Sequence, residues 1–256
     1  MDAIPIRGLL VLTFLLALVS VEAGYWLGKW RSRGDHELEG TASSTVASTL
    51  GLLAFTLAFT FAMAAARYDT RKELVLAEAN AIGTTYLRAL LLPPPHASAV
   101  RDQLRQYVDA RLAAATSPEQ FAEARGRAEQ LHGLLWREAV AAASVQDSER
   151  TSLFIASLNE VIDLHAKRLT ALRNRVPNAI WVFLFLTAVL GMVSMGYHTG
   201  LIGSRRTAAV VFLTLAFSGA LTLIADLDRP QQGLIRVSQQ AMKDLQAGMQ
   251  ADAPAN

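Results

Sequence analysis

The chain has 256 residues, of which 52% are hydrophobic and 18% are charged, so it is more apolar than a typical soluble domain. Its formal net charge is only +2, with acidic and basic residues interspersed, which excludes the basic surface expected of a nucleic-acid-binding protein. The chain has no cysteine, which excludes disulfides, thiolate nucleophiles, iron–sulfur clusters and cysteine-ligated zinc.

Four long apolar blocks contain most of the hydrophobic residues. A helix needs roughly 20 apolar residues to cross a hydrocarbon layer about 30 Å thick, and each block reaches that length. The sequence therefore predicts an all-α integral membrane protein with four transmembrane helices. The blocks are residues 8–29, 43–66, 176–203 and 207–225.

The first block has two interpretations. Arg7 followed by an apolar run and small residues is typical of a cleavable signal peptide. However, the block ends in Lys29, Trp30 and Arg31, an aromatic and basic group typical of a membrane interface. We therefore expect the block to be retained as a transmembrane helix.

The second block lacks a stop signal at its end. Helix-compatible residues continue from Arg67 through Glu73, and the first strong helix breaker is the run of prolines at 93–95. The sequence therefore predicts one long helix that extends from the membrane toward Leu92. Within it, Phe55, Phe59 and Met63 recur at steps of four, a pattern typical of helix packing or of an apolar constriction in a symmetric pore.

Residues 67–175 have the composition of a soluble segment and predict a helical bundle. We expect one helix over residues 98–115, a second that starts at the capping residue Ser117, and a third that starts near Ser148. The third has apolar residues at alternating steps of three and four, which is typical of a bundle or coiled-coil seam. The seam residues are Ile155, Leu158, Ile162, His165, Leu169 and Leu172.

The chain is expected to end in an amphipathic helix over residues 234–249 and a disordered tail from Gln250. No segment alternates apolar and polar residues over the length of a strand, so we expect no sheet. The predicted regions are residues 1–66 with two membrane helices, 67–175 with the cytoplasmic bundle, 176–229 with two further membrane helices, and 230–256 with the C-terminal helix and tail.

The distribution of Lys and Arg near the ends of the membrane helices predicts their orientation. The larger group flanks the termini and the central segment, which places both in the cytoplasm of a multi-pass protein in a bacterial inner membrane. That group is Arg7, Arg67, Arg71, Lys72, Lys167, Arg168, Arg173, Arg175, Arg229, Arg236 and Lys243, against Lys29, Arg31, Arg33, Arg205 and Arg206 on the other side.

The sequence contains no complete set of residues that would indicate an enzyme. The histidines are dispersed without metal-ligand spacing, and the glycines form no phosphate-binding loop. We therefore expect no catalytic residues, no metal site and no cofactor. His165, which lies on the predicted seam, is expected to be a hydrogen-bonded core histidine.

Charged residues gather where two membrane helices end. Asp226, Asp228 and Arg229 follow the fourth block. The charged residues that follow the second are Arg67, Asp69, Arg71, Lys72 and Glu73. These residues are interpreted either as interfacial charges that pair with one another or as an ion-attracting vestibule at a pore mouth.

Two further polar residues, Glu78 and Asn80, interrupt an otherwise apolar part of the second helix. Buried polar groups need hydrogen-bond partners, so this pair predicts a specific polar contact.

Several of the stretches described above resemble the bacterial bestrophin-like family of membrane proteins. The resemblance rests on residues 52–61, on Arg67-Tyr68-Asp69, on residues 78–84, and on Asp226-Leu227-Asp228-Arg229-Pro230 followed by Gly233. A more distant resemblance extends to the bestrophins, which are pentameric ion channels whose second membrane helix lines an apolar neck. That resemblance implies a homo-oligomer, with a pentamer as the expected form, in which Phe55, Phe59 and Met63 line the neck.

The leading hypothesis is therefore an oligomeric ion channel or channel-like protein whose partners are the lipid bilayer and small ions. The alternative is a membrane-anchored interaction or signalling scaffold that binds a partner through its helical bundle.

Overall fold

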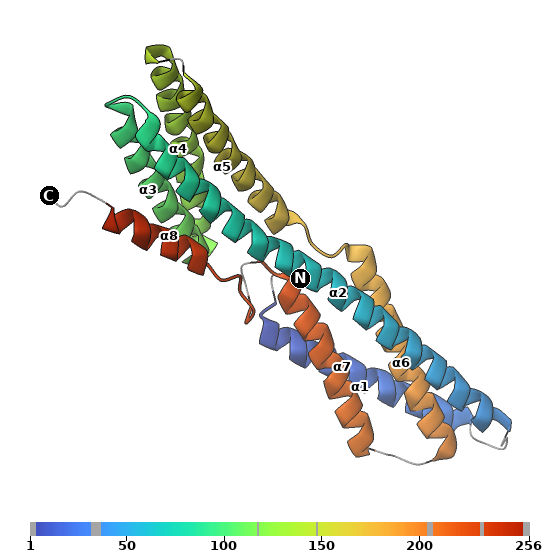
Figure 1. The fold of residues 1–256 in the computed structure, drawn as a ribbon. Coiled ribbons are helices and arrows are strands. Elements are labelled where there is room, and N and C mark those ends of the chain that lie inside the picture. Colours follow the sequence, from blue (N-terminus) through green and yellow to red (C-terminus); the bar gives the residue numbers. More distant parts are fainter. Residues whose placement is uncertain are drawn as a thin grey trace. The chain divides into compact units, whose positions relative to one another are not determined.

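The computed structural model describes residues 4–31, 37–116, 118–146, 148–203, 207–230 and 233–252. Within these ranges the chain is almost entirely helical and contains no strand, which confirms the all-α prediction (Figure 1). The chain forms two compact units. We call Met1–Tyr68 with Arg175–Arg236 the membrane unit, and Asp69–Asn174 with Val237–Asn256 the bundle unit.

Four helical stretches of the described chain are long and apolar enough to cross a membrane, which confirms the predicted number. They comprise α1 (Ile6–Arg31), the first part of α2 (Glu37–Arg88), α6 (Asn178–Ile202) and α7 (Thr207–Asp228). Together these helices form the membrane unit, whose core includes Leu53, Leu184, Met192 and Ile224.

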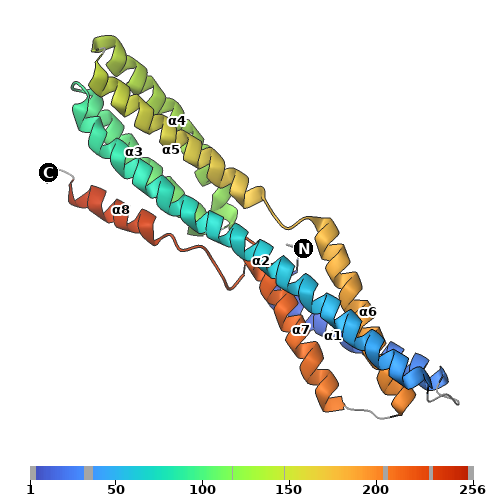
Figure 2. The same ribbon diagram turned by 45° about the vertical axis from the view of Figure 1, so that its right-hand side comes forward.

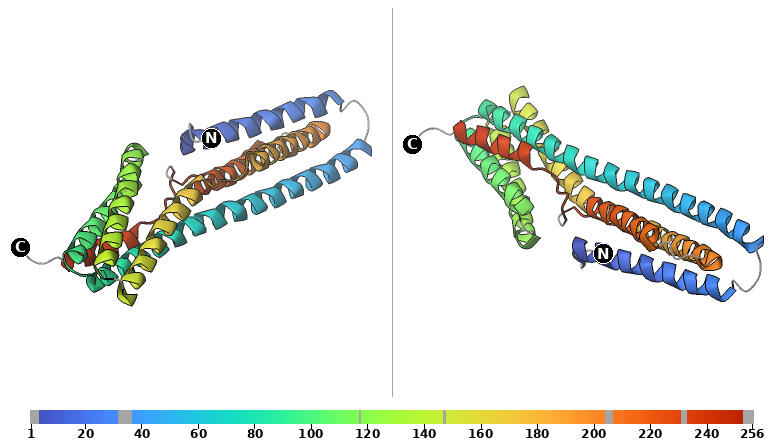
Figure 3. Two further views of the ribbon diagram at one scale, coloured as in Figure 1. Left: turned by 90° about the horizontal axis from the view of Figure 1, so that it is seen from above. Right: turned by 90° about the horizontal axis from the view of Figure 1, so that it is seen from below.

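Helices α1 and α6 lie side by side with their backbones in contact (Figure 3). The contact depends on two pairs of glycines, each pair four residues apart, Gly24 and Gly28 on α1 and Gly196 and Gly200 on α6. A Cβ atom at Gly196 would lie 2.0 Å from the Val21 carbonyl oxygen, and one at each of the other three would lie 2.1 to 2.3 Å from a backbone oxygen. Only glycine permits this approach, which is how helices gain packing energy in a membrane.

The same substitution at two glycines should therefore change stability in opposite directions. We expect Gly196→Ala to destabilise the membrane unit by about 1 to 3 kcal/mol, because its methyl group would overlap backbone that cannot move away. Gly219→Ala on α7 is the matched control, since a Cβ there has no atom within 4 Å and alanine favours helix. Thermal unfolding in detergent measures both variants, and equal melting temperatures would contradict the backbone contact.

The bundle unit contains the second part of α2, η1 (Ala89–Leu91), α3 (His96–Thr116), α4 (Pro118–Val145), α5 (Glu149–Arg173) and α8 (Gln240–Ala251), as Figure 2 shows. Helix α2 continues without a break to Arg88, as predicted from the absence of a stop signal. Helix α5 begins at Glu149, close to the predicted start near Ser148, and Ser148 caps it by accepting a hydrogen bond from the Thr151 amide. The predicted cap, Ser117, lies outside the described residues.

The buried face of α5 differs from the predicted seam by about one residue. Leu158 and His165 are buried as expected, but Phe154 and Val161 lie at the centre of the core. Ile155 and Ile162 are only partly buried and pack at its edge. The displacement has a simple cause: a stripe of apolar residues wider than a two-residue seam is compatible with several rotations of the helix, and the large ring of Phe154 fixes one of them.

The C-terminal helix begins later than the predicted residue 234. Residues 233–238 are not helical, and Leu234 is 77% exposed. The cause is local, because the Asp226 carboxylate accepts hydrogen bonds from the amides of Leu234 and Ile235 and Gly233 has a φ of +128°. The predicted disordered tail was also placed too early, since Gln250 and Ala251 belong to α8; residues 253–256 lie outside the described chain.

Candidate functional site

One side of α2 is exposed along its length, and we call these residues the α2 stripe. Phe55 and Phe59 are 69% and 56% exposed, whereas Leu53, Thr56 and Thr60 on the opposite side are buried. Met63 lies half-buried at the edge. From Phe55 to Glu73, and again from Asn80 to Leu87, the exposed positions recur at steps of three and four, as expected for one side of a helix. The stripe is Phe55, Phe59, Ala62, Ala66, Asp69, Glu73, Asn80, Thr84 and Leu87.

The charged side chains on the α2 stripe are acidic. Asp69 and Glu73 are exposed one turn apart. The nearby basic residues point elsewhere: Arg71 is only 4% exposed, and Arg67 is half-buried with its guanidinium bonded to the Met63 carbonyl oxygen at 3.3 Å. Lys72 is also exposed; it lies about 100° around the helix from Glu73 but only three residues, or about one turn, from Asp69, so it offsets part of their negative charge.

At the end of α7, Asp226, Asp228 and Arg229 are buried and bind backbone groups. Asp226 accepts hydrogen bonds from the amides of residues 234 and 235, at 3.0 and 2.9 Å. Asp228 accepts one from the Val176 amide at 2.8 Å, and Arg229 donates one to the Ile4 carbonyl oxygen at 2.8 Å. These residues therefore connect the end of α7 to the segments that precede α1 and α6 and to the segment that follows α7 itself.

Gly233 belongs to the same arrangement. A Cβ at Gly233 would lie 1.9 Å from the Asp226 carboxylate, and its φ of +128° is one that other residues rarely adopt. The glycine that follows the aspartate motif in the sequence is therefore required by the close approach of the Asp226 side chain.

Glu78 is the centre of an ionic cluster in the bundle unit, and its own side chain is fully buried. Its carboxylate is 0% exposed and accepts a hydrogen bond from the Tyr107 hydroxyl at 2.7 Å. Arg111 lies 3.1 Å away and Arg168 forms a second ion pair with it. Burial alone would raise the pKa of Glu78, but Arg111, Arg168 and the Tyr107 hydrogen bond outweigh burial and lower it. Glu78 is therefore a carboxylate at neutral pH.

Two histidines complete this cluster. The Tyr107 hydroxyl donates its one proton to Glu78, so His165 Nδ1, 3.0 Å from the same oxygen, must be the donor of their shared hydrogen bond. His165 is thus protonated on Nδ1. His132 packs edge to face against it, with ring centroids 4.8 Å apart. In the described chain, Nε2 of each ring is buried without a partner, and burial lowers the pKa of both histidines to about 4.

The structure separates the two polar residues of α2 that the sequence suggested as one contact. Glu78 is buried in the cluster, while Asn80 is exposed on the α2 stripe. Sequence reasoning missed Tyr107 and Arg111 as partners of Glu78. A signal was available, because these two residues lie four apart on the apolar side of α3 and would be expected to share a neighbour.

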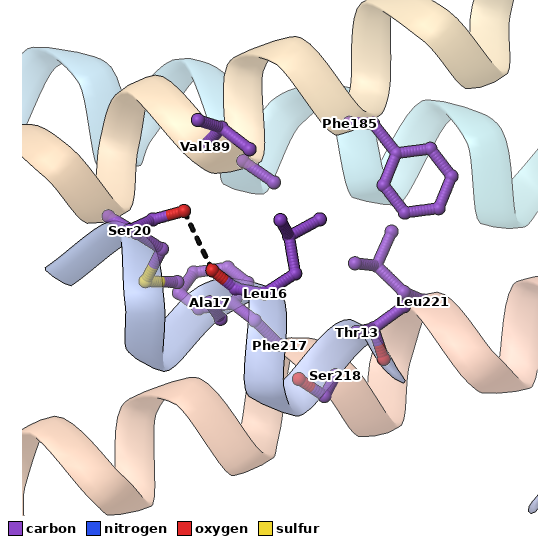
Figure 4. A pocket seen from close by; sticks show the side chains of 11 residues that line it. Thr13, Leu16, Ala17, Ser20, Phe185, Val189, Phe217, Ser218 and Leu221 are labelled. Atoms are coloured by element: carbon purple, nitrogen blue, oxygen red, sulfur yellow. Dashed lines mark hydrogen bonds between the residues drawn. The ribbon is translucent and has the colours of Figure 1, made fainter. Parts of the chain in front are cut away.

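A small cavity of about 20 Å³ lies between α1, α6 and α7, large enough for about one water molecule (Figure 4). Its lining is mostly apolar. The Ser20 hydroxyl is bonded to the Leu16 carbonyl oxygen at 2.7 Å, whereas no partner of the buried Ser218 hydroxyl is found among the described residues. The described chain contains no group of three or more His, Asp or Glu side chains that could bind a metal ion.

These features define a class: an all-α membrane protein with four apolar helices and an exposed aromatic stripe on the second. The model of the bestrophin-like domain matches residues 12–242, and the chain belongs to this family. Among curated proteins, no relative is detected by sequence.

Solved structures of a bacterial bestrophin homologue from Klebsiella pneumoniae have the same fold. One variant of that protein is 16% identical over 96% of each chain, with a TM-score of 0.70. The structure solved with zinc phasing is 15% identical over 95% of this chain and 96% of that one, with a TM-score of 0.65. At these identities the likeness shows the fold alone.

Removing the charge of Glu78 should strongly destabilise the bundle unit. Glu78→Gln leaves two buried guanidinium groups without their carboxylate, and we expect a loss of about 3 to 5 kcal/mol in unfolding free energy. Asn80→Gln, on the exposed side of the same helix, is the matched control and should change stability by less than about 0.5 kcal/mol. Denaturant unfolding followed by circular dichroism measures both, and similar midpoints would contradict the role of the cluster.

Proposed function

We propose that this protein is a homo-oligomeric ion channel of the bacterial inner membrane, in which the α2 stripes of the subunits surround a common pore. The observation that carries the proposal is the exposure of Phe55 and Phe59 on a helix whose opposite side packs within the unit. A second copy of the chain would cover such a face. The bestrophin family assignment and the shared fold with the Klebsiella homologue support this arrangement, and a pentamer is its expected form.

In this arrangement Phe55, Phe59 and Met63 form stacked apolar collars, which close a narrow pore by excluding water. Asp69, Glu73 and Asn80 line the vestibule beyond the collars, with Arg67 at its edge. Asp226, Asp228 and Arg229 support the vestibule from behind through their backbone contacts. Both termini and the bundle unit are assigned to the cytoplasmic side, from the distribution of basic residues.

The stripe also gives the pore a preferred ion. Repeated by symmetry, Asp69 and Glu73 become two rings of negative charge, against one exposed basic residue, Lys72, while Arg71 is buried. Rings of carboxylates concentrate cations and repel anions. We therefore assign the channel to small cations.

Replacing an aromatic side chain of the collar by a small one should increase ion flux. Phe59→Ala widens the apolar collar and lowers the free energy of wetting it, so flux through liposomes containing purified protein should rise severalfold. Phe61→Ala is the matched control, because Phe61 is also exposed on α2 but lies outside the stripe.

Three results would count against a pore on α2. One is a folded oligomer that passes no ion under any gradient, and another is an equal response of Phe59→Ala and Phe61→Ala. The third is a phenotype in cells that tolerates changes at Phe55 and Phe59 but not on the surface of the bundle unit, which would favour the scaffold alternative.

Neutralising the acidic rings should reduce cation preference. In bilayer recordings under a salt gradient, Asp69→Asn with Glu73→Gln should move the reversal potential toward zero, because the vestibule no longer concentrates cations. Lys72→Gln is the opposite-sign control: it removes an exposed positive charge one turn from Asp69 and should move the reversal potential away from zero. The cation assignment is wrong if the wild type prefers anions or if the double variant retains its full preference.

A further inference from the structure

The ionic cluster of the bundle unit contains more positive than negative charge. Glu78 on α2 faces Arg111 on α3 and Arg168 on α5, which leaves one positive charge while both histidines are neutral. Glu129 on α4 is exposed and bonded to Arg125, so it offsets this charge weakly. Gln239, which precedes α8, adds only a neutral amide, bonded to Arg168 at 3.3 Å. Additional positive charge is therefore unfavourable in the closed cluster.

His132 and His165 are the groups that would add positive charge to the cluster, by binding a proton. In the closed state the Nδ1 proton of His165 is donated to the Tyr107 oxygen, and Nε2 has a free lone pair with no donor near it in the described chain. A proton on that nitrogen would be a buried donor without an acceptor, close to Arg111 and to the second imidazole. Water would satisfy the same proton if α4 and α5 moved away from α2 and α3.

We propose that His132 and His165 form a proton-binding site that loosens the contact of α4 and α5 with α2 and α3 when the surroundings become acidic. The site requires both rings and the Glu78 cluster, because the cluster supplies the positive charge that opposes protonation in the closed state. The loosening is a property of the bundle unit alone. Its consequence for ion flow rests on the function proposed above, since α2 is the helix assigned to the pore.

The direction of the effect follows from proton linkage. The pKa of each histidine is about 4 when the cluster is closed, against an ordinary value of 6.5. The neutral rings therefore stabilise the closed state fully above pH 6.5, and this stabilisation is lost as the pH falls from 6.5 toward 4. Over that range each histidine can shift the opening equilibrium by at most about tenfold per pH unit.

Hydrogen exchange of the full-length protein in detergent tests the switch without any ion flux. The quantity compared at pH 7 and pH 5 is the protection factor of peptides that cover α2 around Glu78. Protection factors are used because they correct for the intrinsic pH dependence of amide exchange. We expect protection in the wild type to fall at least tenfold at pH 5. In a variant with His165→Asn and His132→Gln it should stay nearly constant, because the introduced asparagine amide can still donate to Tyr107 but neither new side chain binds a proton. His96→Gln, a histidine of the same unit bonded to Glu138, is the control and should behave as wild type.

Equal loss of protection in the wild type and the double variant would overturn the proposal, as would unchanged protection in the wild type. Where the double variant fails to fold, titration of the two imidazole signals by nuclear magnetic resonance in the wild type decides instead, and ordinary values near pH 6.5 for both would overturn it.

Flux through liposomes at the same two pH values then separates the switch from the channel. A flux that changes with pH in the wild type but not in the double variant supports the link to the pore. An exchange transition in a protein without flux supports the switch and overturns the channel. A flux that ignores pH although the exchange transition occurs overturns the link between them.

Discussion

The complete burial of the Glu78 carboxylate is the constraint on which the bundle unit depends. A buried charge is tolerated only where opposite charges and hydrogen-bond donors surround it, and here they come from two other helices, Tyr107 and Arg111 from α3 and Arg168 from α5. The geometry of these partners fixes the rotation of α2 about its own axis. Within the bundle unit that rotation also decides which residues of α2 are exposed, Asn80 among them.

The membrane unit is stabilised by different interactions. Lipid offers no hydrophobic drive for helices to associate, so contact depends on close backbone packing and on satisfied polar groups. The glycine pairs of α1 and α6 provide the close packing. At the end of α7, Asp226 and Asp228 accept hydrogen bonds from backbone amides that have no partner within a helix. Because Asp226 binds the amides of Leu234 and Ile235, the chain is not helical there and α8 starts later.

The features that depend on local sequence could be predicted. The four apolar blocks follow from length alone, the continuity of α2 follows from the absence of a breaker before the prolines at 93–95, and Ser148 has the side chain of an N-cap. The glycine pairs of α1 and α6 are equally local, since glycines four apart in apolar helices are a known packing pattern. In contrast, the partners of Glu78 are 29 to 90 residues away in the chain. The spacing of Tyr107 and Arg111 indicates that these two share a neighbour, but no pattern within a single helix identifies that neighbour as Glu78.

Burial also separates residues that the sequence placed in one group. Seven positions of α2 contain both acidic and basic residues, among them Arg67, Arg71, Asp69 and Glu73. The sequence alone therefore does not predict whether the exposed charge at this place is negative or positive. In the folded chain Arg71 is buried and Arg67 is bonded to a backbone oxygen, while Asp69 and Glu73 are exposed together with one basic residue, Lys72. The balance of exposed charge thus depends on which side of the helix packs against its neighbours, and that choice is made by residues far away in the sequence.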